Sequence, residues 1–146
     1  PFDNDGVATR SRQVVSDGVL NGYFLSVYTA RKLGMTTTGN AGGCHNLVLE
    51  PGREDLAGLI RQVKRGLLVT ELLGQGVNYV NGDYSRGAAG YWIENGEIAY
   101  PVEEITIAGN LKEMFMNIAG VGNNVVVRGS KQTGSILIQR MTVAGA

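Results

Sequence analysis

The sequence has 146 residues, with 13 basic and 13 acidic side chains and therefore no formal net charge. This length predicts a single domain over 1–146, and the 43% hydrophobic and 18% charged content predicts that the chain folds. Zero net charge and the lack of a long apolar run argue against nucleic-acid and membrane partners. One cysteine and one histidine can form neither an internal disulfide nor a closed zinc site, so we expect a cytoplasmic location.

The first third of the chain predicts one hairpin, one helix and one further strand. Asp17 and Gly18 form an Asx-Gly pair, in which both residues tolerate the positive φ of a tight hairpin turn. Ser26 can cap a helix that Gly34 then ends. The elements expected here are strands at 13–16 and 19–25, a helix at 26–33 and a strand at 46–50.

The middle third predicts a helix followed by strands. The helix has one apolar stripe, an acidic first turn and a basic end, which is the polarity that a helix dipole favours. Asn95 and Gly96 form a second Asx-Gly hairpin turn, and Pro101 is expected to close that hairpin. The elements expected here are a helix at 54–64, strands at 67–72 and 76–80, and a hairpin of 88–94 with 97–100.

The last third repeats the mixture of strands with one helix, which Asn110 caps and Gly120 ends. Strands outnumber helices along the whole chain and do not alternate with them regularly. The predicted class is therefore α+β, with a mostly antiparallel sheet and about three short helices. The elements expected here are a strand at 104–107, a helix at 110–119, and strands at 124–127, 135–139 and 141–143.

The side chains that can carry chemistry form no familiar catalytic pattern. Cys44 and His45 are neighbours, and in an extended segment they point in different directions, so they form no dyad by themselves. A triad with a distant serine and aspartate stays open, although a structural or substrate-wall role is favoured for this pair. Glu103 and Glu104 are consecutive, which on a strand sends them to opposite faces and makes them a poor acid/base pair.

Residues 81–92 form the densest polar and aromatic stretch. Ser85 does not lie in a Gly-x-Ser-x-Gly nucleophile elbow, because Gly82 is one place too early. One interpretation is a glycine-rich hairpin whose aromatic side chains pack on the sheet. The other is that small residues let a peptide backbone lie against this strand, with Arg86 or Asp83 orienting it.

Long and unusual strings resemble the TldD/PmbA family, and most closely its PmbA (TldE) branch, formerly described as a modulator of DNA gyrase. They cover nearly the whole chain, so the resemblance is specific. The strings are NGYFLSVYTARKLG at 21–34, TTGNAGG at 37–43, GDYSRGAAG at 82–90, IENGEI at 93–98, YPVEE at 100–104, IAGNL at 107–111 and TVAG at 142–145.

The resemblance implies a metalloprotease system in which TldD and TldE subunits pair and degrade or mature unfolded peptides. Family members are about three times as long, so this chain resembles their C-terminal third. In TldD-like subunits, two histidines of a His-Glu-x-x-x-His helix and a cysteine of the C-terminal domain hold zinc, and the glutamate serves as general base. That cysteine falls after the region of Gly122, where 124–135 contains none, and Cys44 does not match its position.

The resemblance therefore implies a non-catalytic subunit with no catalytic or metal-binding residue in this chain, and zinc in a TldD-like partner. The expected partners are a TldD-like subunit or a second copy, together with unfolded peptides. One alternative is a purely structural dimerisation domain without peptide contact, and another is an independent hydrolase that uses Ser85 or Cys44. The residues expected to line the substrate channel are Asn40, His45, Asp83, Tyr84, Ser85, Arg86, Gly90 and Tyr91.

Overall fold

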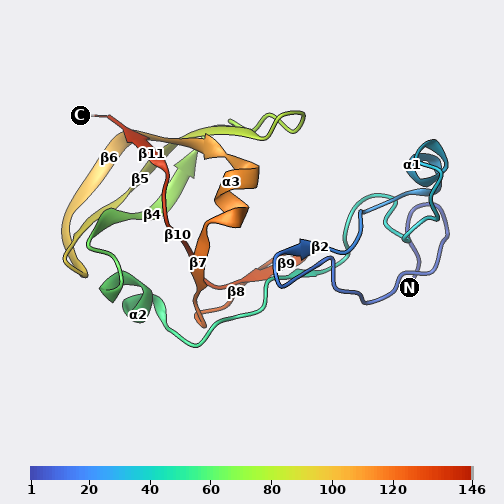
Figure 1. Cartoon of the computed structure of the whole chain (residues 1–146), viewed down its shortest axis with the longest axis horizontal. Helices are drawn as coiled ribbons and strands as arrows, with labels where there is room; N and C mark the ends of the chain where they lie inside the picture. The colour runs from blue at the N-terminus through green and yellow to red at the C-terminus, as the bar shows by residue number, and fades with distance from the viewer. Residues whose placement is uncertain (146) are drawn as a thin grey trace. The chain divides into compact units, whose positions relative to one another are not determined.

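The computed structural model describes residues 1–145, which form two compact units. Unit 1 comprises residues 1–48 with 128–132, and unit 2 comprises residues 49–127 with 133–145. The described residues hold eleven strands and three short helices, and nearly all of the strand pairs are antiparallel (Figure 1). The α+β class predicted from the sequence is thus confirmed. The expectation of a single domain over 1–146 stays a prediction.

Unit 1 contains the predicted hairpin and helix. Strands β1 (Val15–Ser16) and β2 (Val19–Leu20) pair across Asp17 and Gly18, whose φ angles are 50° and 76°. Helix α1 (Val27–Lys32) starts at a capping box, because the Ser26 side chain accepts the Thr29 N–H while the Ser26 N–H donates to the Thr29 hydroxyl. Both elements are shorter than predicted.

Strand β3 (Leu47–Val48) also belongs to unit 1 and pairs in parallel with Lys131 and Gln132 of β9 (Lys131–Thr133). The sequence did not predict β9. The strand predicted at 124–127 corresponds to β8 (Val126–Arg128), which precedes β9 in the chain.

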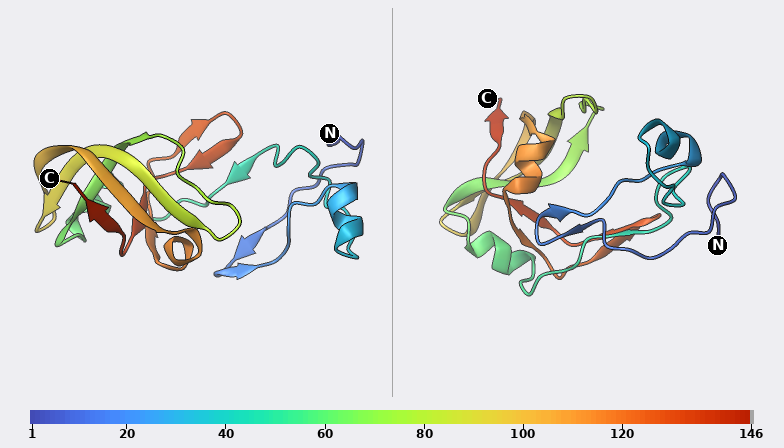
Figure 2. Two further views of the ribbon diagram at one scale, coloured as in Figure 1. Left: turned by 90° about the horizontal axis from the view of Figure 1, so that it is seen from above. Right: turned by 45° about the vertical axis from the view of Figure 1, so that its right-hand side comes forward.

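Unit 2 is built on a four-stranded antiparallel sheet in the order β11-β6-β5-β4. Its two longest strands form a twisted ribbon (Figure 2), and the turn between them has Asn95 at φ 51° and Gly96 at φ 83°. This confirms the second predicted hairpin. The strands are β4 (Arg65–Leu73), β5 (Asp83–Glu94), β6 (Glu97–Asn110) and β11 (Thr142–Ala144).

Two predictions for this sheet are wrong. Strand β6 does not end at Pro101, because β11 pairs only with 106–108 and leaves an edge of β6 open, where the missing N–H of proline is tolerated. The strand predicted at 76–80 reduces to one bridge between Val77 and Tyr84. After it the chain turns, since the Asn78 side chain accepts the Val80 N–H and the Asn78 carbonyl accepts the Gly82 N–H.

Helices α2 (Leu56–Arg61) and α3 (Leu111–Met116) are capped by Asp55 and Asn110, whose side chains accept backbone N–H groups of the first turn. The helix predicted at 110–119 ends early because β7 (Ile118–Val121) pairs with β10 (Ile136–Ile138). Strand pairing therefore overrides the helical spacing of the apolar residues. The core of unit 2 consists of Ala88, Ile105 and Ile107, packed against Leu67, Val69, Tyr84, Val102 and Met141.

Candidate functional site

Strand β5 carries most of the predicted channel residues, and both of its edges are occupied. Strand β4 pairs with 87–94, and β6 pairs along the whole strand. Where β4 has ended, the Ser85 N–H donates to the Gly76 carbonyl at 2.7 Å and the Asn78 N–H donates to the Asp83 carbonyl at 2.8 Å. A peptide cannot add to β5 as a new strand, so a peptide backbone that lies against β5 can do so only on a face of the sheet.

The glycines of β5 make room for the chain's own backbone. A Cβ added at Gly90 would overlap the Leu68 carbonyl oxygen and lie 3.1 Å from the Thr70 nitrogen. A Cβ at Gly87 would lie 3.2 Å from the Leu73 Cβ. Close approach of β4 therefore explains these two glycines without a second chain.

The alternation of side chains along β5 divides the predicted residues between two faces. One face, which we call the core face, carries the buried Ala88, and Tyr84 packs there against the core. The opposite face carries small side chains that end at Tyr91, which is 40% exposed. On the core face lie Tyr84, Arg86 and Gly90, and on the opposite face lie Asp83, Ser85 and Tyr91.

Arg86 is half-buried and incompletely paired. One guanidinium nitrogen, Nη2, donates to the Leu72 carbonyl at 3.4 Å. Within residues 1–145 its Nε is a buried donor without a hydrogen-bond partner. A buried donor of this kind calls for an explanation, and an acceptor such as water or a carboxylate would satisfy it.

Asp83 has its carboxylate engaged in a polar network at the start of β5. It accepts hydrogen bonds from Asn81 Nδ2 at 2.7 Å and from Asn110 Nδ2 at 3.4 Å. Asn110 also donates to the Asn81 carbonyl and caps α3 through Lys112 N. This network fastens the 78–82 turn to the start of α3, which gives Asp83 a structural task.

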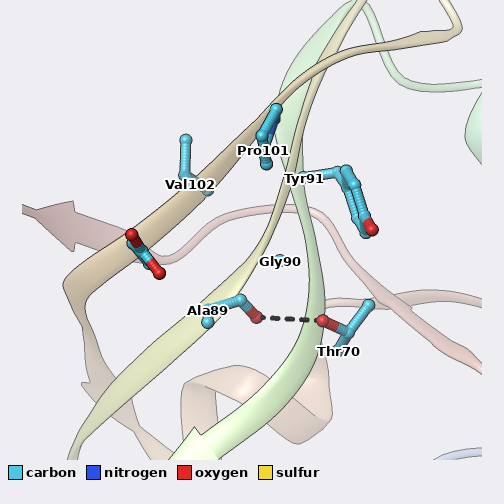
Figure 3. Close-up of a pocket in the computed structure, with 7 residues that line it drawn as sticks. Thr70, Ala89, Gly90, Tyr91, Pro101 and Val102 are labelled. Carbon is cyan, nitrogen blue, oxygen red and sulfur yellow. Dashed lines mark hydrogen bonds between the residues drawn. The ribbon is translucent and has the colours of Figure 1, made fainter.

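A hollow of about 360 Å³ lies where both neighbours of β5 bulge. On β4, Thr70 is the extra residue between the partners of Gly90 and Ala89. On β6, Glu103 and Glu104 both oppose Ala89. Figure 3 shows the hydrogen bond, 3.4 Å long, from the Thr70 hydroxyl to the Ala89 carbonyl. The lining residues are Thr70, Ala89, Gly90, Tyr91, Pro101, Val102 and Glu103.

Glu104 has a φ of 55°, in the left-handed region that side chains other than glycine rarely adopt. The regular alternation expected for Glu103 and Glu104 is thus wrong, because a bulge intervenes. Sequence reasoning placed the segment 83–92, and with it Ala89, Gly90 and Tyr91, in the channel wall but missed the lining residues of β4 and β6. The available signal was a proline followed by two consecutive acidic residues inside a strand.

Asn40 and His45 lie in unit 1, whereas the β5 residues lie in unit 2. The Asn40 Oδ1 accepts hydrogen bonds from Arg12 Nη2 at 3.2 Å and from the Thr38 hydroxyl at 2.9 Å. His45 Nε2 is 3.3 Å from the Phe2 carbonyl oxygen. Within unit 1 both side chains therefore contact their own chain.

Asp3 is a buried carboxylate of unit 1 that sequence reasoning missed. It accepts the backbone N–H groups of Asp5 and Val7 at 2.9 Å and of Ala41 at 2.8 Å. The hydrogen bond from the Ala41 N–H is the largest cause that lowers the pKa of Asp3, and burial acts in the opposite direction. The N–H groups of Val7 and Asp5 and the charge of His45 lower this pKa further. The Asx turn at the start of the chain was the available signal.

No three histidine, cysteine, aspartate or glutamate side chains of residues 1–145 cluster as a metal site requires. The described side chains therefore do not fit a zinc ion, and no catalytic step is assigned to a metal in this chain. The same residues include no helix with the length and apolarity of a bilayer crossing.

The sequence profile of the PmbA/TldA metallopeptidase C-terminal domain matches residues 1–145. The chain belongs to this family. Metalloprotease PmbA of Escherichia coli O157:H7 is 52% identical over 145 residues, which cover 99% of this chain and 32% of PmbA. A metalloprotease TldD homologue of Haemophilus influenzae is 29% identical over 133 residues, 84% of this chain and 28% of the homologue. The higher identity to PmbA agrees with the branch expected from the sequence.

Solved structures of related proteins share the fold. A crystal structure described as a modulator of a DNA gyrase from Thermotoga maritima superposes with a TM-score of 0.90 at 41% identity, over 99% of this chain and 35% of that one. TldE from Thermococcus kodakarensis gives a TM-score of 0.84 at 29% identity, over 99% of this chain and 36% of that one. The chain spans about a third of the length of these relatives.

Proposed function

We propose that this PmbA/TldD-family chain is the C-terminal domain of a non-catalytic subunit in a cytoplasmic zinc metalloprotease complex. In this proposal it forms part of the substrate channel and of the subunit interface, and the complex degrades or matures unfolded peptides. The identity of 52% to metalloprotease PmbA and the likeness to TldE support the assignment to such a complex. A TldD-like partner, or a second copy, would complete it.

The observation that carries the peptide contact is the hollow at Ala89, at the end of a floor of small side chains on the face opposite the core. Ser85 and Gly87 precede Ala89 on this face, and their partners on β6 are Ala108 and Thr106. An extended peptide can lie across such a floor without pairing its main chain to β5. Contacts of this kind are tolerant of sequence, which suits unfolded substrates.

The residues of the core face support that floor from beneath. Tyr84 packs on the core, and Gly90 lets β4 approach closely. Asn40 and His45, in unit 1, remain proposed channel residues that the hollow does not include. Zinc, when bound in a TldD-like partner, would supply the nucleophilic water, whereas this chain would position the peptide.

The alternative of a purely structural pairing domain has its own support in unit 2. Tyr79 and Val80, in the turn after β4, are 86% and 96% exposed, and Phe115 and Met116 on α3 are 68% and 73% exposed. Apolar side chains displayed in this way are typical of interfaces between proteins. A Ser85 or Cys44 hydrolase predicts labelling by a fluorophosphonate or iodoacetamide probe with a matching loss of activity.

The test is photo-crosslinking in the full-length heterodimer. A benzophenone amino acid replaces Tyr91, which lines the hollow, or Tyr100 on the same sheet, which does not. We expect an unfolded peptide substrate to crosslink at position 91 and not at position 100. The same amino acid is also placed at Val80 and at Ser85. Crosslinks from position 80 to the partner subunit, with no peptide crosslink at position 85 or 91, would instead establish the structural pairing domain.

A further inference from the structure

We infer that the hollow at Ala89 binds a primary ammonium group of the peptide, either its N-terminal amine or a lysine side chain. This inference rests on the proposed function and names the chemistry that the channel would recognise. The polar side chains that line the hollow are Thr70, Tyr91 and Glu103, and no lysine or arginine is among the lining residues. The one charged side chain that lines the hollow is thus a carboxylate, which favours a cation as its ligand.

The first acceptor is the Glu103 carboxylate. Glu103 is exposed, and it is one of the residues that line the hollow. Its neighbour Glu104 keeps a left-handed φ of 55° on the bulge, and such outliers persist only where surrounding structure imposes them. The bulge thus brings both glutamates opposite Ala89, and Glu103 is the one that lines the hollow.

The second acceptor is the backbone itself. The Ala89 carbonyl receives the Thr70 hydroxyl at 3.4 Å, which is at the weak end of hydrogen-bond lengths. A carbonyl oxygen has two lone pairs, so it can accept a stronger bond from an ammonium N–H. The Ala89 carbonyl points toward β4, where Glu71 is the register partner of Ala89 and Thr70 is the extra residue of the bulge.

Tyr91 supplies an aromatic wall, and Pro101 lies directly opposite it on β6. Figure 3 shows both on one side of Gly90, with Ala89 and Thr70 on the other. The negative face of an aromatic ring attracts an ammonium ion, whereas it does not attract a carboxylate. A peptide C-terminus would also meet the negative charge of Glu103, so it is disfavoured at this site.

The test compares the affinities of four peptides for the full-length protein, measured by fluorescence anisotropy at low salt. All share one unstructured sequence of glycine, serine and alanine. The first has a free N-terminus, the second is N-acetylated, the third is N-acetylated with one central lysine, and the fourth is N-acetylated with norleucine in that place. We expect the peptides with an ammonium group to bind about fivefold more tightly than the others. The first and third peptides separate the two sources of the ammonium.

Two variant pairs locate the effect. Glu103→Gln and Tyr91→Leu should each remove most of the preference for an ammonium group. Their matched controls, Glu97→Gln and Tyr100→Leu, lie on β6 outside the hollow and should retain it. Equal affinity for all four peptides, or a preference that survives Glu103→Gln, overturns this inference while peptide binding itself stands. If no peptide binds and none crosslinks at position 91, the proposed function fails as well.

Discussion

Two glycine-rich segments of this chain, 37–43 in unit 1 and 82–90 in unit 2, look alike in sequence but are used differently. In both, glycines admit the chain's own backbone: a Cβ at Gly39 would lie 2.7 Å from the Ala8 carbonyl oxygen, and one at Gly90 would overlap that of Leu68. In unit 1 the polar side chains of Asn40 and Asp3 form hydrogen bonds with other residues of the chain. In unit 2 the bulges beside Ala89 leave acceptors at a surface hollow.

The difference teaches that glycine content alone does not mark a binding surface. Glycines mark the places where two backbone segments approach closely. Polar groups that form no contact within the chain mark the places where a ligand can bind. By this criterion the hollow in unit 2 is the better candidate for peptide contact. The following experiments test whether the two segments really differ in this way.

The largest effect is expected from Gly90→Ala. The added methyl group overlaps the Leu68 carbonyl, so β4 or β5 must shift, and we expect a loss of about 3 kcal/mol in the free energy of unfolding. Gly109→Ala is the matched control in the neighbouring strand, because its Cβ would meet Met114 at an ordinary 3.6 Å. Urea unfolding measures both, and equal stability of the two variants would contradict the packing role of Gly90.

The parts of the fold that could be predicted from the sequence are those that local interactions determine. The turn at Asn95 and Gly96 and the capped start of α1 follow from short-range chemistry, and both were predicted. β7 was missed because its residues continue a helical pattern and become a strand only by pairing with β10. The hollow was missed because the positive φ of Glu104 depends on neighbouring strands rather than on its residue type.

The second experiment concerns acid and unit 1. The pKa of Asp3 lies below its ordinary value of 3.8, so its carboxylate contributes stability above about pH 3.8, and this contribution is lost as the pH falls through the folded-state pKa. We expect protection from hydrogen exchange at Val7 and Ala41, whose N–H groups it holds, to fall over that window.

Asp3→Asn should lower that protection at neutral pH and weaken its dependence on acid below pH 4. Asp17→Asn is the control, because Asp17 lies in the β1–β2 turn, where asparagine tolerates the same positive φ. Identical pH profiles for the wild type and Asp3→Asn would show that another group governs the acid response of unit 1.

A smaller effect is expected at Arg86, which lies on the core face. Arg86→Met keeps the aliphatic stem and removes the buried Nε that lacks a partner, so stability should change by less than about 1 kcal/mol. Arg86→Ala also removes the stem and should cost more. Peptide cleavage by the full complex should follow the folded fraction in both variants. A tenfold loss of cleavage in a fully stable Arg86→Met variant would instead place this guanidinium against the peptide.

The smallest expected effect is that of zinc on the isolated chain. We expect no stoichiometric zinc after dialysis, because a closed site needs three or four nitrogen, sulfur or oxygen ligands at one point, and no three such side chains of residues 1–145 cluster. Chelator should therefore leave the unfolding midpoint of the chain unchanged, since a structural metal contributes its binding free energy to folding. The same chelator should stop cleavage by the full heterodimer if the partner holds the metal. One tightly bound zinc per isolated chain, lost together with stability in Cys44→Ser, would place a metal site in this domain and remove the reason for calling it non-catalytic.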